Sequence, residues 1–261
     1  MKLLGIKIFS TDVLSNYNLV EAGIEAIKNK NFDYIELFAE PDSYESTHTK
    51  LADLLQGVRV IIHAPHSSQG MDTGNPEAFE NNRHLLKSSQ QFADLFNAEI
   101  IILHAGANIG EKYLNETVRQ FNLINDKRIA VENLPAYCTT TKMPLHATSP
   151  AQIKQIKQET GCKFCFDISH AVCAANSAKR DAWEDLKAYQ ELVPDMYHLC
   201  DNTWDNTCDE HRHYGEGNYD LNKILNQIIS DNKPITMETG KGLPKDISPW
   251  LEDAAYLRKL M

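Results

Sequence analysis

The chain has 261 residues, which is enough for one large domain with a substantial core or for two modest ones. It carries 26 Lys and Arg against 36 Asp and Glu, a formal net charge of −10. A field of this sign repels phosphate backbones and disfavours a generic nucleic-acid-binding protein. The opening residues lack the apolar region and cleavage site of a signal peptide, and no apolar stretch is long enough to span a membrane. We therefore expect a soluble, cytoplasmic protein.

Short apolar runs alternate with longer amphipathic stretches along the whole chain. The eight strand candidates lie at 3–9, 34–39, 59–65, 99–106, 128–135, 163–170, 196–202 and 234–240. Helical patterns include 18–30, 76–97, 149–160, 221–231 and 248–261. Eight strand–helix units in about 250 residues are typical of a TIM barrel. A doubly wound sheet is disfavoured because no glycine-rich dinucleotide fingerprint or P-loop is present. The sequence thus predicts an α/β protein, a (β/α)8 TIM barrel, with 1–261 as a single domain.

Metal-capable side chains recur where the predicted strands end. They are His63 followed by His66, His104, Glu132, Asp167 followed by His170, His198 followed by Asp201, and Glu238. The carboxyl ends of barrel strands meet at one rim, where active sites lie. One such histidine alone is more often a hydrogen-bonded structural residue. Six successive strands share the pattern, however, and crowded carboxylates repel one another unless divalent cations are bound. The pattern predicts a metal centre at this rim.

The stretch "CDEHRHYGEGNYD", residues 208–220, follows the seventh predicted strand and lies over the same rim. Asp209 and His211 are two residues apart, so in extended backbone both side chains face one side and can bind one ion. The glycines of "GEG" allow a tight return of the loop. His213 has the same parity, and we assign it as a candidate for substrate binding.

Together these segments resemble the xylose isomerase-like TIM barrels, a superfamily that includes the endonuclease IV family of class II apurinic/apyrimidinic endonucleases. The resemblance rests on "HAPH", "ILHAG", "VEN", "FDISHA", "YHLCDN", "DEHRHYGEG" and "METG", in that order along the chain. It implies up to three divalent ions, held by His63, His104 and Glu132, by Glu132, Asp167, His198 and Glu238, and by His170, Asp209 and His211. His66 is the alternative to His63, which we favour because it ends its strand directly. The resemblance also implies a single-metal site at Glu132, Asp167, His198 and Glu238, as in the ketose epimerases of the same superfamily.

The sequence departs from endonuclease IV at two motifs, and the second of them concerns DNA binding. The glycine–glutamine motif after the fifth-strand Glu is replaced by "ENLPAYC". The loop after the second strand, which carries an Arg in that family, reads "AEPDSYES" and has only acidic charges. Glu36, inside the second strand, is more typical of sugar isomerases, and we assign it with His66 to substrate binding. These features weaken the expectation of a DNA substrate.

The sequence therefore predicts a metal-dependent hydrolase of phosphoesters, in which clustered ions activate water and neutralise the phosphate. Glu132 and Glu238 are the expected catalytic residues, and either zinc or manganese suits the mixed ligand set. The substrate is left open between abasic DNA and a smaller phosphoester. The alternative is a sugar or sugar-phosphate isomerase or epimerase with one ion, in which Glu132 and Glu238 act as general bases. A catalytically inactive barrel is a third hypothesis, disfavoured because every ligand position is filled.

Overall fold

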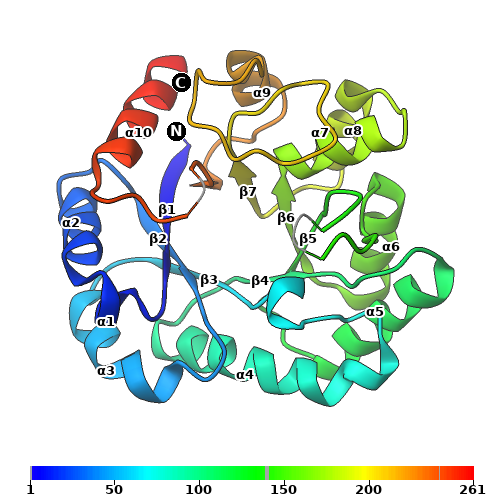
Figure 1. Ribbon diagram of the computed structural model, residues 1–261, viewed down its shortest axis with the longest axis horizontal. Coiled ribbons are helices and arrows are strands. Elements are labelled where there is room, and N and C mark those ends of the chain that lie inside the picture. Colours follow the sequence, from blue (N-terminus) through cyan, green and yellow to red (C-terminus); the bar gives the residue numbers. More distant parts are fainter. Residues whose placement is uncertain (1, 139–140, 241) are drawn as a thin grey trace.

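The computed structural model describes residues 2–138, 141–240 and 242–261. Eight parallel strands form a closed barrel in chain order, ringed by helices (Figure 1). The strands are β1 (Leu3–Phe9), β2 (Tyr34–Phe38), β3 (Val60–His63), β4 (Ile101–His104), β5 (Ile129–Glu132), β6 (Lys163–Asp167), β7 (Met196–Leu199) and β8 (Pro234–Met237). The predicted TIM barrel and all eight of its strands are thereby confirmed.

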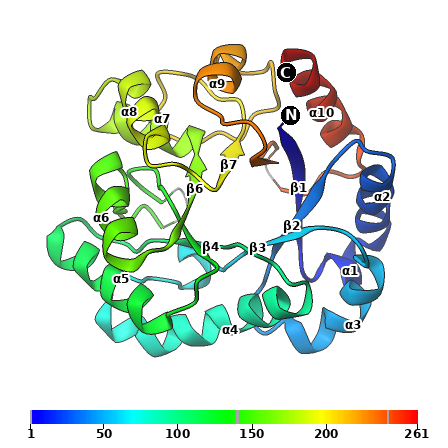
Figure 2. The ribbon, with the colours of Figure 1, turned by 180° about the vertical axis from the view of Figure 1, so that it is seen from behind.

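Helices cover the outside of the barrel, as the view from behind also shows (Figure 2). They are α1 (Asp12–Ser15), α2 (Tyr17–Lys28), α3 (Tyr44–Leu54), α4 (Phe79–Leu95), α5 (Glu111–Ile124), α6 (Pro150–Thr160), α7 (Ile168–Ser177), α8 (Ala182–Gln190), α9 (Leu221–Gln227) and α10 (Ser248–Leu260), with 3-10 turns η1 (Ser67–Gln69) and η2 (Pro76–Ala78). No helix in the described ranges has the length and apolar character needed to cross a membrane.

Most strands end earlier than predicted, because the sequence runs included residues of the following loop or helix. The clearest case is 163–170, where β6 stops at Asp167 and α7 begins at Ile168. The Asp167 carboxylate accepts a hydrogen bond from the backbone N–H of His170 at 2.6 Å and caps the helix. His170 therefore reaches the rim from the first turn of a helix, whereas we expected it at the end of a strand.

Side chains that point into the barrel form two layers. Successive side chains of a strand alternate between its faces, so residues two apart share the interior face. The lower layer consists of Gly5, Tyr34, Ile61, Ile102, Ala130, Cys165, Met196 and Thr236. The upper layer, two residues further along each strand, consists of Lys7, Glu36, His63, His104, Glu132, Asp167, His198 and Glu238. Every strand thus contributes one polar or charged side chain directly above a small or mostly apolar one.

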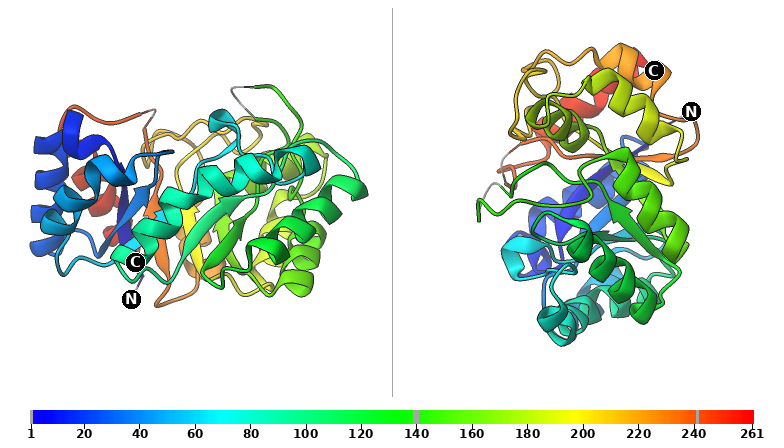
Figure 3. Two further views of the ribbon diagram at one scale, coloured as in Figure 1. Left: turned by 90° about the horizontal axis from the view of Figure 1, so that it is seen from below. Right: turned by 90° about the vertical axis from the view of Figure 1, so that its right-hand side faces the viewer.

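Tyr34 fills the middle of the lower layer. Its side chain is fully buried and packs with Ile61, Ile102 and Met196, and its hydroxyl hydrogen-bonds the hydroxyl of Thr236 at 2.8 Å. Gly5 makes room for it, because a Cβ at this position would overlap the tyrosine ring. The side view shows both chain termini at one end of the barrel and the long loops after β5 and β8 at the other (Figure 3, left). The upper layer therefore lies at the end that carries the loops.

Candidate metal centre

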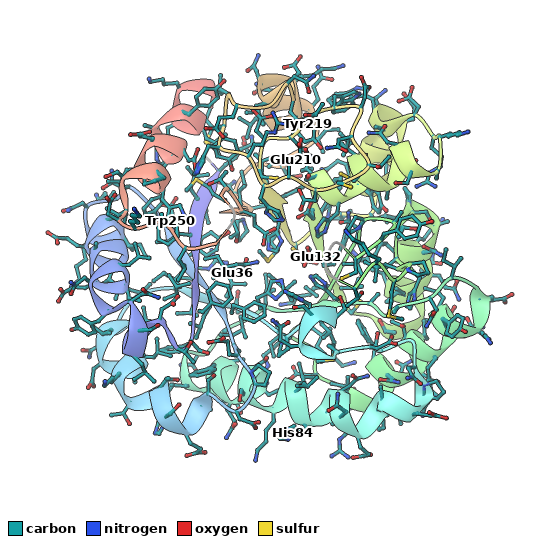
Figure 4. All side chains as sticks on the ribbon, in the orientation of Figure 1. Glu36, His84, Glu132, Glu210, Tyr219 and Trp250 are labelled. Atoms are coloured by element: carbon teal, nitrogen blue, oxygen red, sulfur yellow. The ribbon has the colours of Figure 1, made fainter. Side chains whose placement is uncertain are left out.

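The two oxygens of the Glu132 carboxylate face two different groups of side chains that are candidate metal ligands. Its Oε2 lies 3.0 Å from Nε2 of His104 and 3.5 Å from Nε2 of His63. Its Oε1 lies 3.3 Å from Nδ1 of His198 and 3.3 Å from Nδ1 of His170. Glu132 is almost fully buried, and Figure 4 shows it inside the barrel with Glu36, while His84 lies on the outer edge. This arrangement suits a carboxylate that bridges two ions.

A second group of ligand atoms surrounds Nδ1 of His198. This nitrogen lies 3.4 Å from Glu238 Oε1 and 3.8 Å from Asp167 Oδ2, in addition to its contact with Glu132. Ligand atoms bound at 2.0–2.2 Å to one tetrahedral zinc ion lie roughly 3.3–3.6 Å apart. The spacing of Glu132, Asp167, His198 and Glu238 is close to that of an ion-centred shell, and all four ligand atoms lie within 4.8 Å of one another.

Hydrogen bonds fix which ring nitrogen each of four histidines offers to the cavity. His63, His170 and His211 donate Nδ1–H to the backbone carbonyls of Ala64, Asn133 and Glu238, at 2.7, 3.0 and 2.7 Å. Their Nε2 atoms are therefore the ones that face the cavity and would bind a metal after loss of any proton they carry. His198 is the reverse, since its Nε2–H donates to Glu36 Oε2 at 2.9 Å and leaves Nδ1 for the ion. Such outer hydrogen bonds are the usual means of orienting metal-binding histidines.

The third predicted group is brought together by the loop after β7. Asp209 Oδ2 lies 2.6 Å from Nε2 of His211 and 3.4 Å from Nε2 of His170. The predicted extended backbone at Asp209 and His211 is wrong, because His211 has φ +49° and lies in the left-handed region. The two side chains still meet. Asp201 shapes this loop, since its Oδ2 accepts hydrogen bonds from the N–H groups of Gly215 and Gly217 at 2.8 and 3.1 Å.

Charge and orphaned polar atoms indicate that this cluster fits divalent cations. Glu132 Oε2, His198 Nδ1 and Asp209 Oδ2 are buried and, although each lies near an atom of opposite polarity, none makes a hydrogen bond of normal geometry within the described residues. Burial raises the pKa of Asp167 to about 7, and the nearby carboxylates Glu238, Asp209 and Glu132 reinforce this rise. A bound cation would both satisfy the orphaned atoms and remove the repulsion among the carboxylates.

Three side chains that we assigned to substrate binding occupy different environments. His66 lines the cavity, its ring stacked on His104 with centroids 5.3 Å apart, and burial lowers its pKa to about 2. His63, and not His66, belongs to a compact ligand group, which favours our preferred choice. Glu36 is fully buried beneath the rim, and His213 hydrogen-bonds Asp253 at 2.8 Å outside the metal-facing cavity.

Lys7 is the residue of this site that sequence reasoning missed. Its Nζ lies 3.0 Å from Glu36 Oε1 and also hydrogen-bonds Glu238. Burial opposes its charge, but Glu238 and Glu36 outweigh burial and raise the pKa of Lys7, so it is an ammonium at neutral pH. The available signal was a lone Lys in the apolar run "LLGIKIF", at the interior-facing position two residues after Gly5.

Comparison with known proteins agrees with this geometry. The family model of the xylose isomerase-like TIM barrel matches residues 24–260. The chain belongs to this family. A probable endonuclease 4 of Mycobacterium leprae is 23% identical to it over 269 residues, covering 98% of each chain.

Solved structures of both functional branches share the fold. A D-tagatose 3-epimerase-like protein superposes with a TM-score of 0.73 at 20% identity, covering 99% of this chain and 96% of that one. Endonuclease IV of Thermus thermophilus gives a TM-score of 0.70 at 19% identity, covering 98% and 99%. The similarity of these structures establishes the fold and leaves the reaction to be argued from the site.

Proposed function

We propose that this protein is a divalent-metal-dependent phosphoester hydrolase with a multinuclear centre, acting on a small substrate. The observation that carries the proposal is the Glu132 carboxylate, whose two oxygens face separate ligand groups. A site for a single ion beside Oε1 of Glu132 does not need His63 and His104, which lie beside its other oxygen, Oε2. The Nε2 atoms of His170 and His211, which the Nδ1 hydrogen bonds of these rings orient toward Asp209, support a third ion in the same cavity.

The mixture of histidines and carboxylates suits zinc best, with manganese as the second choice. When bound, such ions supply a nucleophile from water at neutral pH and neutralise charge on the phosphate. Hydrolysis would form a bond from water oxygen to phosphorus and break the bond from phosphorus to the ester oxygen, which would receive a proton. The chain itself would hold the ions through Glu132 and Glu238 and fix the histidine rings through their outer hydrogen bonds.

A small substrate is favoured over DNA. The chain is acidic overall, and the turn between β2 and α3 carries Glu40 and Asp42. A protein that binds duplex DNA needs Lys and Arg side chains in contact with the DNA phosphates. We expect binding to undamaged duplex DNA weaker than about micromolar at physiological salt.

The test combines metal counting with three assays on the same zinc-loaded preparation. We expect more than one ion per chain by elemental analysis and anomalous scattering, together with hydrolysis of aryl phosphate esters. A single ion and no hydrolysis would refute the proposal. Nanomolar binding to an abasic-site duplex, with incision on its 5′ side, would replace the small substrate with DNA.

A second candidate function, epimerisation of a small ketose, is favoured by one observation. Glu132 and Glu238 both contact Nδ1 of His198, and with Asp167 they form a complete set of ligands for one ion. Two carboxylates beside one ion suit proton removal and return on opposite faces of a sugar carbon. Solvent-deuterium exchange at that carbon, measured by NMR with one ion per chain, would support this function instead.

A further inference from the structure

Two neighbouring pockets, which we call the first and second lobes, lie above the barrel and share three lining residues. The first lobe, of about 220 Å³, is lined by most of the candidate metal ligands, on the side of β3, β4 and β5. The second lobe, of about 240 Å³, lies between β1 and β8 and contains none of the residues from those three strands. Lys7, His211 and Glu238 line both lobes and form the junction between them.

The walls of the second lobe are mainly apolar. They are formed by Phe9, Met237, Thr239, Gly240, Gly242, Leu243 and Trp250. Besides the junction residues, this wall carries no charged side chain among the described residues. Binding sites for small molecules typically combine such aromatic and aliphatic walls with a few polar groups that fix orientation. The polar groups lie at the junction, so a ligand in this lobe meets them at one end only.

Each lobe alone is smaller than the roughly 300–1,000 Å³ of pockets for drug-sized ligands, and only together do the lobes reach that range. The second lobe thus has room for about one ring-sized group. At the junction, the Lys7 side chain is 20% exposed, and its ammonium pairs with Glu36 below it and with Glu238 beside it. The positive charge that a phosphate needs would come from the ions proposed for the first lobe.

From this arrangement of the two lobes we infer that the second lobe binds the organic group of a small phosphoester, a single largely apolar ring, while its phosphate lies in the first lobe. This inference rests on the proposed hydrolase function, because the first lobe must accept a phosphate. It adds a substrate class: esters of one ring-sized alcohol, with no need for a nucleic-acid strand. Burial of a ring against Phe9, Leu243 and Trp250 would supply the additional affinity.

The test compares two phosphonates, whose P–C bond is not hydrolysed, on the zinc-loaded protein. Isothermal titration calorimetry should give phenylphosphonate an affinity about tenfold or more above that of methylphosphonate, because only the phenyl ring reaches the second lobe. Equal affinities would overturn the inference and leave the proposed function intact. If neither phosphonate nor inorganic phosphate binds, the proposed function fails, and the inference fails with it.

Variants then locate the ring. Leu243→Trp fills the second lobe and should abolish the preference for phenylphosphonate while methylphosphonate still binds as in the wild type. Leu123→Trp makes the same change at a side chain of α5 that is 54% exposed, and it should keep the preference. A preference unchanged in Leu243→Trp would overturn the inference. If that variant loses zinc or folded structure, Phe9→Ala, at another residue that lines the second lobe, replaces it. The affinity for phenylphosphonate should then be severalfold weaker, and an unchanged affinity would overturn the inference.

Discussion

The two interior layers of the barrel come from the same eight strands but have opposite chemistry. The lower layer is mostly apolar, with Tyr34, Ile61 and Met196 among its members, and its side chains are fully buried or nearly so. The upper layer, only two residues further along, holds four carboxylates, three histidines and one lysine. The lower layer stabilises the fold through apolar packing. The upper layer places like charges close together, and their repulsion destabilises the fold. Substitutions in the two layers should therefore change different measured quantities.

The largest effect should follow Glu132→Gln in the upper layer. Loss of the bridging charge should remove at least one metal ion and lower kcat by about a thousandfold or more, roughly 4 kcal/mol. The metal-free variant should still give the circular-dichroism spectrum of a folded barrel. Ile102→Ala in the lower layer is the matched control and should lower the free energy of unfolding by about 2–5 kcal/mol while all metal ligands remain. An unchanged rate and metal count in Glu132→Gln would contradict the assigned site.

Lys7→Met should show that the upper layer depends on its own charge balance. Glu36 would keep a buried negative charge with His198 as its remaining partner, and removing one partner of a buried ion pair is destabilising. We expect urea denaturation to show a loss of about 3 kcal/mol in the free energy of unfolding. This is the low end of the roughly 3–5 kcal/mol expected for a buried ion pair, because Lys7 is partly exposed. The double variant Lys7→Met/Glu36→Gln should recover much of it. If the losses of unfolding free energy of the two single variants simply added in the double variant, the result would contradict an ion pair between Lys7 and Glu36.

The Asp209→Asn/His211→Asn double variant extends the comparison to the loop above the upper layer. Removal of this pair should cost one metal ion per chain and lower the rate about a hundredfold, because charge stabilisation of the phosphate is lost. Elemental analysis and kcat are the measurements. A metal count equal to the wild type, with the effect confined to substrate affinity, would indicate that the pair contacts a sugar hydroxyl and favour the epimerase.

The smallest effect is a gain in stability, from Asp167→Asn in metal-free protein. The pKa of Asp167 is raised by burial to about 7, above the value of roughly 3.9 for a free Asp. Its contribution to stability is therefore present below pH 4 and is lost as the pH rises to about 7 and beyond. At pH 8 in EDTA, Asn should raise the unfolding free energy on the order of 1–2 kcal/mol, since part of the gain is offset by lost attraction to His170. At pH 4 the two proteins should be alike, and a loss of stability at pH 8 would contradict the assigned repulsion.

The fold was predictable because its signals are local. Alternation of apolar runs with amphipathic stretches gave all eight strands, and reading the end of each run placed His104, Glu132 and Glu238 at one rim. Lys7 was not predicted, because candidate residues were sought mainly at the ends of strands. It lies in the middle of β1 and reaches the site through its long side chain. Extending the two-residue alternation to the first strand would have found it.

Other features of the site depend on contacts between distant parts of the chain. Glu36 was assigned to substrate, but its carboxylate meets His198, which is 162 residues away, and this pairing selects the ring nitrogen that faces the cavity. No local pattern encodes such a partner. The shape of the loop after β7 was likewise hidden, because the left-handed backbone at His211 and the hydrogen bonds of Asp201 to two glycine N–H groups are products of tertiary folding.

The packing of Tyr34 over Gly5 also determines by which route substrate and product reach and leave the site. Its ring and the lower-layer neighbours fill the described barrel interior beneath the ligands, so arriving and departing molecules share the mouth at the loop end. For a phosphoester hydrolase, inorganic phosphate would have to leave by the path that the next ester must take. Exchange at the mouth would then be sequential, and phosphate would compete with the ester for entry.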